Sequence, residues 1–566
     1  MSPGAIPGRG DRLVGLPHAT RGMIMAPNGA AATSQPLATQ VALDILKRGG
    51  SAMDAAIAAN AVLGLVEPTG SGLGGDLFAL VWDPAEKTLF AYNGSGRSPA
   101  RLSLEAARAK VGANGYLPRF GAVAASVPGC ADGWFALHGR FGRLPMAELL
   151  APAIGYARGG FPVTPLIAAY WRQAMRTILS LGTEGVIEET ANARAAFTRD
   201  GGAPRAGERW TNPDLARTYE TLAAGGRAAF YQGPIAETVG AYMRRIGGWL
   251  RAEDLAAHAG DWVQPISTSY RGYDIWQSPP NTQGFSVLQM LNLIEGFDLA
   301  AMGPGSADAL HVMIEAKKLA FADRARYLAD PAFSPVNIEA LVSKPYADQR
   351  RALIDIAKAS QTVEAGAPPA HGDTVYLTTA DKDGMMVSLI QSNYFIMGCG
   401  LVPDGLGFML QNRGALFSFE PGHANLYAPG KRPLHTIIPG FVTRDGEPWL
   451  SYGVMGGAMQ PQGHVQVLAN LIDFGMNLQE AGDAARWQHF GAGTPDDPAL
   501  EPGGEVTLES GIAPDAAEDL RRRGHRITPS RALSGYGGYQ AIGWDAASRT
   551  YRAASEMRFD GQAGGY

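Results

Sequence analysis

The stretch His371–Gly384, HGDTVYLTTADKDG, decides how the rest of the chain is interpreted. A strand-forming run begins abruptly at Thr374. It follows the segment EAGAPPA (364–370), whose paired prolines disfavour both helix and ladder hydrogen bonds. Two interpretations fit this junction. Thr374 is an ordinary strand start, since threonine favours strands, or the chain is cut before Thr374, which then becomes an N-terminal nucleophile.

The sequence after Thr374 predicts three β-hairpins and one helix. Each hairpin pairs two apolar-rich runs around a short polar or glycine-containing turn. The pairs are TVYLTTA (374–380) with MMVSLIQS (385–392), HTIIPGFVT (435–443) with WLSYGVMGG (449–457), and YQAIGWD (539–545) with YRAASE (551–556). The helical pattern QGHVQVLANLIDFG (462–475) lies between the second and third hairpins.

The sequence before Thr374 is richer in helical patterns. PLATQVALDILKRGG (36–50) predicts a helix that starts near Pro36, and SAMDAAIAANAVLGLVEP (51–68) predicts a second helix with a capping box of Ser51 and Asp54. Period-3.6 patterns dominate the middle, from about 102 to 356. Strands and helices therefore mix along the chain, which predicts an α+β fold with layered, αββα-like architecture.

A glycine-rich segment, TGSGLGGDLFALVWD (69–83), follows the second helix and leads into a predicted strand, 76–82. A dinucleotide-binding fingerprint runs in the opposite order, from strand through glycine loop to helix. A lysine followed by Ser or Thr, as phosphate-binding loops require, is also missing from this segment. The glycines therefore predict a close-packed backbone turn.

Composition excludes several classes of protein. The 566 residues are 46% hydrophobic and carry a formal net charge of −5, and no basic cluster is denser than the RRR at 521–523, which argues against nucleic-acid binding. Cys130 and Cys399 form no C-x-x-C pair, and the ten histidines show no metal-ligand spacing, so no metal and no cofactor is expected.

The N-terminal segment predicts a location and a tail. Residues 1–22 contain no apolar signal region, and no run of 18 apolar residues occurs in the chain, so we expect a cytoplasmic protein without a membrane partner. Residues 1–22 are predicted to be a flexible tail.

An N-terminal threonine would carry its own catalytic base. Its α-amine titrates at about 7.7–8.0 in model peptides, and the neutral amine takes the hydroxyl proton directly or through one water. Acyl transfer also needs N–H donors for the oxyanion, and Gly456 and Gly457 at the end of a predicted strand allow the close backbone approach that such donors require. The same glycines also fit an ordinary turn.

With these residues identified, the chain resembles the γ-glutamyltransferase family of N-terminal nucleophile hydrolases over residues 23–566. Five motifs in one order carry the resemblance. They are PLATQVALDILKRGGSAMDAAIAANAVLGLVEPTGSGLGGDLFALV (36–81), TVYLTTADKDG (374–384), NRGALFSF (412–419), GKRPLHTIIP (430–439) and MGGAMQPQGHVQ (455–466).

The resemblance implies a fold and a maturation step. The fold is the αββα four-layer sandwich, and the chain is a proenzyme that cuts itself between Asp373 and Thr374 through an ester intermediate. The products are a helix-rich large subunit, 23–373 with the tail, and a small subunit, 374–566, which stay associated as one composite domain. Mature Thr374 then forms an acyl-enzyme with an amide substrate, and water or an amine accepts the acyl group.

Family roles in catalysis carry over by resemblance to four residues. Thr374 matches the nucleophile, and Ser392 matches a hydroxyl residue that supports it from the next strand. Gly456 and Gly457 match the oxyanion pair. The catalytic positions are thus intact.

The positions that hold a γ-glutamyl α-amino group in the family are different here. Asn, Gln and Asp in the family align with Tyr394, Arg413 and Leu416, while Asn393 lies one residue earlier. An ammonium group beside Arg413 without its Asp would be desolvated and repelled. Arg413 instead favours an anion through its fork of donors, or forms a structural ion pair elsewhere.

The positions that hold the α-carboxylate differ as well. Two family serines align with His435 and Thr436, and the family Arg aligns with Ser95. Arg97 lies two residues further on, which keeps the same face of an extended segment. The segment EPGHANLYAP (420–429) is shorter than in relatives with a lid, which predicts a more open site.

Three functions remain open at this point. The first is hydrolysis or transfer of a γ-glutamyl group, as in glutathione hydrolases and γ-glutamyltransferases, and the second is hydrolysis of an amide whose acyl group lacks the α-amine, of the oxamate, glutaryl or cephalosporin type. The third is a non-catalytic binding protein on the same fold. The intact Thr374, Gly456 and Gly457 favour an enzyme, and the altered pocket favours the second function.

We expect purified protein to consist of two chains, of which the smaller begins Thr-Val-Tyr-Leu. Intact-mass measurement with N-terminal sequencing checks this expectation. Thr374→Ala should abolish both the cut and turnover, because it removes the hydroxyl that performs both reactions. A single chain that stays intact on long incubation at neutral pH, or an active Thr374→Ala variant, would refute the assignment.

Overall fold

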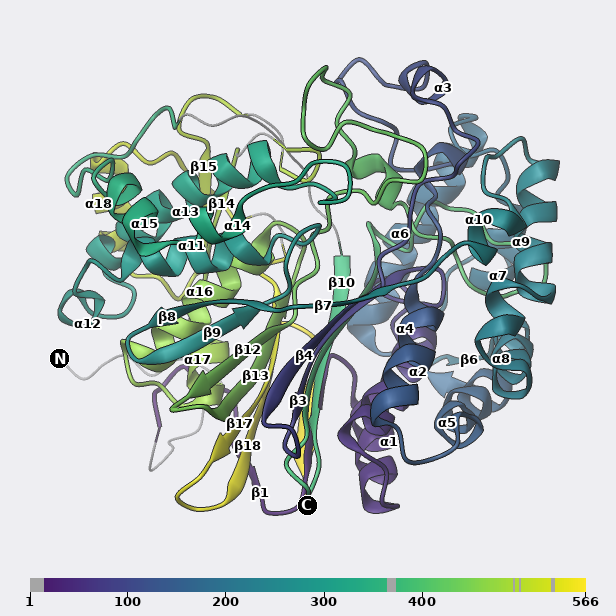
Figure 1. Ribbon diagram of the computed structural model, residues 1–566, viewed down its shortest axis with the longest axis horizontal. Helices are drawn as coiled ribbons and strands as arrows, with labels where there is room; N and C mark the ends of the chain where they lie inside the picture. Colours follow the sequence, from purple (N-terminus) through teal and green to yellow (C-terminus); the bar gives the residue numbers. More distant parts are fainter. Residues whose placement is uncertain (1–14, 364–372, 492–493, 498–499, 531–534) are drawn as a thin grey trace.

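The predicted α+β class is confirmed by the computed structural model, which contains two large sheets (Figure 1). The structure describes residues 15–363, 373–491, 494–497, 500–530 and 535–566, with Asp373 and Thr374 described only in their backbone. Each large sheet has seven strands, and neighbouring strands within each pair antiparallel. No helix in these described ranges is long and apolar enough to cross a membrane.

The two large sheets interleave strands from distant parts of the sequence. Sheet A contains, in spatial order, β1 (Ile24–Ala26), β18 (Thr550–Ser555), β17 (Gly538–Asp545), β13 (Glu447–Met455), β12 (Gly440–Arg444), β9 (Tyr273–Gln277) and β8 (Ile266–Tyr270). Sheet B contains β19 (Gln562–Gly565), β2 (Ala30–Thr33), β10 (Asp373–Ala380), β11 (Met386–Tyr394), β3 (Asp76–Asp83), β4 (Thr88–Asn93) and β7 (Asp261–Val263).

All three predicted hairpins form, as β10–β11, β12–β13 and β17–β18. The second is shorter than expected, because β12 begins at Gly440 and the predicted strand residues 435–439 lie outside it. Pro439 has no N–H to donate to a ladder, and the His435 N–H donates instead to the Asn281 carbonyl at 2.8 Å. This departure frees His435 and Thr436 for the site described below.

Helices cover the outer faces of the paired sheets (Figure 1). On the side of sheet B, the apolar core contains α1 (Pro36–Lys47), α2 (Ala52–Val66), α4 (Cys130–Phe141), α5 (Met146–Gly159) and α8 (Pro213–Tyr231). On the side of sheet A it contains α11 (Gly284–Ile294), α13 (Ala307–Tyr327) and α16 (Met459–Ile472). The predicted capping box is present, with the Ser51 side chain accepting from the Asp54 N–H at 3.1 Å.

The remaining helices and short strands lie outside the two large sheets, and several of them add residues to the same apolar cores. The helices are α3 (Leu104–Arg108), α6 (Pro165–Thr183), α7 (Ala191–Phe197), α9 (Pro234–Arg245), α10 (Ala252–Ala256), α12 (Leu299–Met302), α14 (Ile338–Leu341), α15 (Lys344–Arg351), α17 (Leu478–Asp483) and α18 (Pro514–Arg522). The short strands are β5 (Phe161–Pro162), β6 (Arg209–Trp210), β14 (Trp487–Phe490), β15 (Glu505–Leu508) and β16 (Ile527–Thr528).

A small apolar cluster joins the two sheets near the start of β10. It consists of Phe78, Tyr376, Ile390, Ile437 and Met455, with Phe559 packed against it. The five core residues are at most 3% exposed. Burying a large apolar side chain contributes roughly 1.5–3 kcal/mol, so the cluster holds β10, β11 and β13 in fixed relative positions.

The glycine-rich segment is the close-packed turn that the sequence predicts. A Cβ atom on Gly74 would lie 1.9 Å from the Met409 carbonyl oxygen, and one on Gly75 would lie 2.3 Å from the Ser392 carbonyl oxygen. No side chain fits at such distances. The turn therefore supports the end of β11, where Ser392 lies.

Part of the segment predicted to be a flexible tail is attached to α17. The Leu16 N–H donates to Glu480 Oε1 at 2.8 Å, and both the N–H and the hydroxyl of Thr20 donate to Asp483 Oδ2 at 2.7 Å. Residues 1–14 lie outside the described residues. The predicted tail, 1–22, therefore extends too far, because its last third is hydrogen-bonded to α17.

The segment just before the predicted cut is also fixed to the small-subunit half. The Ala359 N–H donates to the Arg523 carbonyl at 2.8 Å, and Arg523 Nη1 donates to the Ile356 carbonyl at 3.0 Å. Gln361 Nε2 donates to the Gly524 carbonyl at 3.2 Å. These bonds hold the chain up to two residues before the undescribed segment 364–372.

We expect the two chains to co-elute after the cut. Strands β10 and β11, in the predicted small subunit, lie between β2 and β3 of the predicted large subunit. Separating the two chains would therefore break the pairing on both sides of β10 and β11 and open the shared core. Size-exclusion chromatography of processed protein, followed by a denaturing gel, checks this. Two separate peaks in the absence of denaturant would contradict the interleaved arrangement.

Candidate active site

The backbone pairing at the start of β10 places Thr374 across from the step that contains Ser392 and Asn393. Asp373 pairs with Tyr394 and Val375 pairs with Gln391, so β11 has one residue more than β10 across this step. Such a bulge bends a strand locally and re-aims its side chains. Ser392 and Asn393 occupy the widened step beside Thr374, while the side chains of Asp373 and Thr374 lie outside the described residues.

The end of β11 is held in an unusual conformation. Tyr394 has φ of +82°, a region that non-glycine residues rarely adopt and that costs about 1–3 kcal/mol. The Tyr394 N–H donates to Ser392 Oγ at 2.8 Å, and the Phe395 N–H donates to Asn412 Oδ1 at 3.0 Å. These two bonds fix the strained turn, so the Tyr394 side chain has a defined position.

The predicted oxyanion pair connects β13 to α16. Gly456 and Gly457 have φ of +123° and +57°, and their carbonyls accept from the Met459 and Gln460 N–H groups at 3.0 and 3.1 Å. In the described ranges, no acceptor is bound to the N–H of either glycine. The pair therefore offers two free N–H donors at the N-terminus of a helix, where the dipole favours negative charge.

Arg413 is fully buried and only partly hydrogen-bonded. Its Nη1 donates to Thr436 Oγ1 at 2.8 Å, and its guanidinium carbon lies 4.9 Å from the centre of the Tyr394 ring. Its Nε and Nη2 atoms have no hydrogen-bond partner among the described residues. Burial lowers the pKa of Arg413 to about 10. The guanidinium therefore remains charged at neutral pH.

Asp76 supplies the buried counter-charge. His435 Nε2 donates to Asp76 Oδ2 at 3.0 Å, and Gln411 Nε2 donates to Asp76 Oδ1 at 2.9 Å. Burial alone would raise the pKa of Asp76, but His435, Arg413 and Gln411 outweigh it, and the pKa lies below its ordinary value. Asp76 is therefore a carboxylate, and its charge offsets that of Arg413.

His435 is neutral in this arrangement. Burial and the nearby Arg413 charge lower the pKa of His435 to about 3. Asp76 accepts the Nε2 proton, so Nδ1 carries the lone pair. His435 thus acts as a neutral donor that positions Asp76, rather than as a charged group for a carboxylate.

Two predicted pocket residues are used differently. Asn393 Nδ2 donates to the Met397 carbonyl at 3.0 Å, and its amide packs against the glycine-rich turn, so it supports the backbone. Arg97 pairs with Asp330 at 3.5 Å, and no contact joins it to Arg413 or Thr436 in the described ranges. The structure thus brings together Tyr394, Arg413, His435 and Thr436, but not Arg97.

The site is also less open than its short loop predicts. Arg413, Tyr394, His435 and Thr436 are each at most 1% exposed in the continuous chain. Burying the Arg413 charge without a counter-charge would cost several kcal/mol. The Asp76 carboxylate is therefore required for Arg413 to be buried.

Sequence reasoning missed four contributors. Asp76 and Gln411 form the carboxylate network, and Gln283 Nε2 donates to the carbonyls of Gly457, at 2.9 Å, and Thr436. Asp496, paired with Arg324, adds a negative charge that raises the pKa of Arg413. Of these four residues, only Asp76 could have been suspected from the sequence, because it directly follows the glycine-rich turn.

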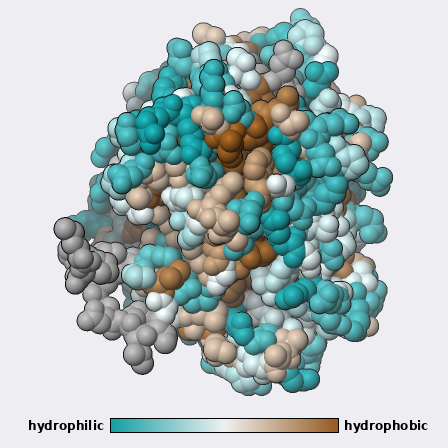
Figure 2. Space-filling model, turned by 90° about the vertical axis from the view of Figure 1, so that its left-hand side faces the viewer, coloured by the Kyte–Doolittle hydropathy of each residue, from teal (hydrophilic) through white to brown (hydrophobic). Residues whose placement is uncertain are grey.

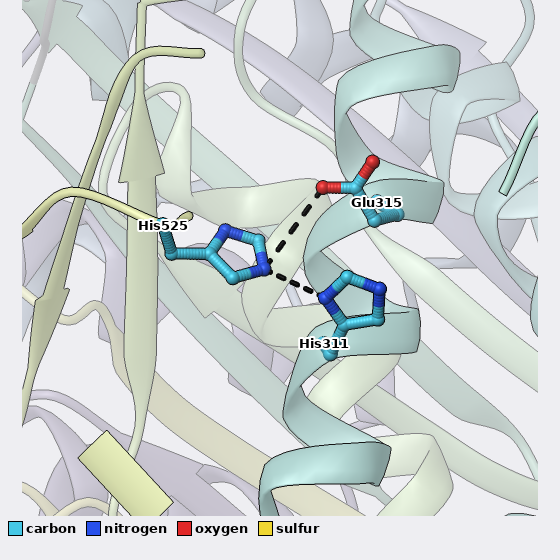
Figure 3. A group of neighbouring side chains, drawn as sticks. All are labelled: His311, Glu315 and His525. Carbon is cyan, nitrogen blue, oxygen red and sulfur yellow. Dashed lines mark hydrogen bonds and ion pairs between the residues drawn. The ribbon is translucent and has the colours of Figure 1, made fainter. Parts of the chain in front are cut away.

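A separate cluster of metal-capable groups lies between α13 and the segment after α18 (Figure 3). His311 Nδ1 and His525 Nε2 are 2.8 Å apart, and His525 Nε2 lies 4.0 Å from Glu315 Oε1. Lys318 donates to Glu315 Oε1 at 2.7 Å. Because this ammonium already neutralises Glu315, it would repel a divalent cation at the cluster. We therefore interpret the cluster as a contact that joins α13 to the segment after α18.

Comparison with known proteins agrees with this geometry. A model of the family described as Gamma-glutamyltranspeptidase matches residues 38–566. The chain belongs to this family. It is accordingly a hydrolase of N-terminal nucleophile type that is made as a proenzyme.

Relatives within the family differ in their named substrates. The chain is 38% identical to the Glutathione hydrolase-like YwrD proenzyme of Bacillus subtilis, over 80% of this chain and 83% of that protein. It is 34% identical to the Oxamate amidohydrolase proenzyme of Klebsiella pneumoniae, over 97% and 99%. The structure of cephalosporin acylase from Bacillus halodurans matches with a TM-score of 0.89 and 42% identity, covering 100% and 99%.

The buried histidine predicts a loss of stability in mild acid. His435 has a pKa near 3 when folded and about 6.5 when unfolded. Between these values the unfolded chain binds more protons, so stability falls as pH is lowered through the window. The limit is about 1.4 kcal/mol per pH unit for one histidine.

Urea-unfolding midpoints between pH 7.5 and 5 measure this slope. His435→Asn keeps an N–H donor for Asp76 but does not titrate, so its slope should be shallower than that of the unaltered chain. An identical slope in both proteins would show that His435 does not contribute.

Proposed function

We propose that the chain is an amidohydrolase for amides whose acyl group ends in a carboxylate and lacks an α-amine. The acyl group is carried on Thr374 after the bond between Asp373 and Thr374 has been cut. The architecture would be the αββα sandwich of N-terminal nucleophile hydrolases. Small dicarboxylic monoamides, of the oxamate or glutaryl type, form the substrate class.

The free edge of Arg413 carries the proposal. Nε and Nη2 point two N–H groups in parallel from one side of the guanidinium, and both lack a partner among the described residues, while Nη1 is held by Thr436. A carboxylate has the matching spacing and accepts two such bonds. An anionic acyl terminus would satisfy both donors at once.

The same pocket disfavours the α-ammonium of a γ-glutamyl group. Tyr394 and Leu416 occupy positions where the family has Asn and Asp, and both are buried. An ammonium there would lie beside the Arg413 charge, and the nearby Asp76 carboxylate already accepts hydrogen bonds from His435 and Gln411. Each 1.4 kcal/mol of such a penalty is about tenfold in affinity.

The proposed reaction uses the amine and hydroxyl of Thr374 together with two backbone N–H groups. The Thr374 α-amine takes the hydroxyl proton, and Oγ attacks the amide carbon, while the N–H groups of Gly456 and Gly457 stabilise the oxyanion. The amine leaves with that proton. Water then attacks the acyl ester and gives a proton to the Thr374 α-amine, which passes it to Oγ as the acyl–Oγ bond breaks and the carboxylic acid leaves. Ser392, one of the two residues across from Thr374 in the sheet, is assigned to support the nucleophile.

γ-Glutamyl hydrolysis or transfer is the second candidate. The names of relatives at 38% and 33% identity, both glutathione hydrolase types, favour it. A non-catalytic role has no observation in its favour, because the threonine and both oxyanion glycines are present.

Turnover of glutaryl-p-nitroanilide and γ-glutamyl-p-nitroanilide separates the two candidates. We expect kcat/KM to be at least about tenfold higher for the glutaryl compound, from one avoided charge repulsion. Arg413→Gln should lower kcat/KM for the glutaryl compound and reduce the ratio of glutaryl to γ-glutamyl kcat/KM, because the two parallel N–H donors of the guanidinium are lost.

Two controls accompany this comparison. Arg158→Gln removes an exposed arginine from α5 and should leave both rates unchanged. Processing and thermal stability of Arg413→Gln show whether the variant folds. Faster turnover of the γ-glutamyl compound by the unaltered enzyme would overturn the proposed acyl preference.

A further inference from the structure

A large groove lies outside the acyl pocket. Its volume is about 1140 Å³, and it is bordered by α6 on one side and by the segments after α17, β15 and β18 on the others. Its apolar and aromatic lining includes Leu166, Tyr170, Ile512, Tyr536, Met557 and Phe559. A volume of this size accommodates a drug-sized organic group.

One end of the groove adjoins the oxyanion pair. A Cβ atom on Gly456 would lie 3.2 Å from Gly537 Cα and 3.6 Å from the Gly535 carbonyl oxygen, so the 535–537 turn lies against Gly456. Gly535 borders the groove. Phe559, in the same wall, packs on the cluster that contains Tyr376, two residues after Thr374. The groove therefore ends close to the reacting centre.

The acyl pocket contacts the other glycine. Gln283 Nε2 bridges the carbonyls of Gly457 and Thr436, and Thr436 in turn binds Arg413. The two glycines thus separate the acyl pocket from the groove. An amide whose carbonyl oxygen is held by both glycines would extend its acyl part toward Arg413 and its amine part into the groove.

The charged groups that border the groove already have partners. Arg558 forms ion pairs with Glu509 and Glu556, and the Asp483 carboxylate accepts hydrogen bonds from Thr20. Leu16 and Met557 in the lining are 40% and 37% exposed. Pro304 and Ala513 in the lining adjoin α12 and α18, which lie at the left of Figure 1, and Figure 2, which views that side, shows apolar residues gathered along the middle of the face. Such a wall favours an uncharged, aromatic or bulky apolar group over an ion.

We propose that this groove binds the amine part of the amide and selects an uncharged aromatic or bulky apolar amine. The proposal rests on the proposed function, since it takes Thr374 as nucleophile. The Thr374 Oγ–carbon bond forms as the carbon–nitrogen bond breaks, the Thr374 amine passes its proton to the leaving nitrogen, and the neutral amine occupies the groove before it departs.

Narrowing the groove tests the proposal. Leu166→Trp and Met557→Trp each fill part of it, and turnover is compared for a primary amide, a p-nitroanilide and a 2-naphthylamide of one acyl group. We expect kcat/KM for the 2-naphthylamide to fall at least tenfold, and for the primary amide to change less than twofold. Leu353→Trp, at a 57% exposed leucine outside the lining, should change neither.

The outcomes separate this proposal from the acyl preference. The comparison is run in whichever acyl series, glutaryl or γ-glutamyl, the enzyme turns over, so a failed acyl preference leaves the groove test intact. Calorimetric titration of processed enzyme with N-(2-naphthyl)acetamide measures binding without relying on turnover. The Trp variants should bind this probe at least tenfold more weakly. Equal losses for all amides, unchanged rates, or no binding of this probe would overturn the proposal.

Discussion

The buried carboxylate of Asp76 is the constraint on which the site depends. It accepts N–H groups from Gly96 and Gly129 at 2.9 and 3.2 Å, in addition to those of Gln411 and His435. Four separate chain segments therefore converge on one charge, which would cost several kcal/mol to bury without them. Among the described residues, no carboxylate contacts the buried Arg413 guanidinium directly. The nearby negative charge of Asp76 therefore makes the burial of Arg413 tolerable.

This convergence explains why the surrounding backbone is so tight. Cβ atoms on Gly96 and Gly129 would each lie 1.6 Å from a carbonyl oxygen, of Val127 and Gly94 respectively. A side chain at either position would push an N–H donor away from Asp76 and leave the carboxylate short of partners. The glycines are thus required by hydrogen bonding to a buried charge, and the abundance of glycine in the sequence has a local electrostatic cause at this site.

Much of the fold was predictable because it depends on local patterns. The hairpins, the Ser51 capping box and the glycine turn each require residues a few positions apart, and each forms as expected. The pocket depends instead on contacts across hundreds of residues. Asp76 and His435 are 359 positions apart, so the sequence shows neither their pairing nor the neutral state of His435. The ion pair between Arg97 and Asp330 could not be predicted for the same reason, since a distant loop supplies the carboxylate.

In the proposed function, the two halves of a substrate meet different surroundings. Around Arg413 the side chains are buried and the guanidinium is charged, and the strained φ of Tyr394 shows that the backbone is held there against its own preference. Beyond Gly456 the groove is wide, and its charged groups are already bound by other residues of the chain. A closed charged pocket discriminates strongly, because a wrong group leaves a buried donor unpaired. A broad apolar groove discriminates less strongly, because it favours uncharged, bulky groups without requiring one particular hydrogen-bonding pattern. Selectivity in this enzyme should therefore be strongest for the acyl group, with a weaker preference for uncharged aromatic or bulky apolar amines.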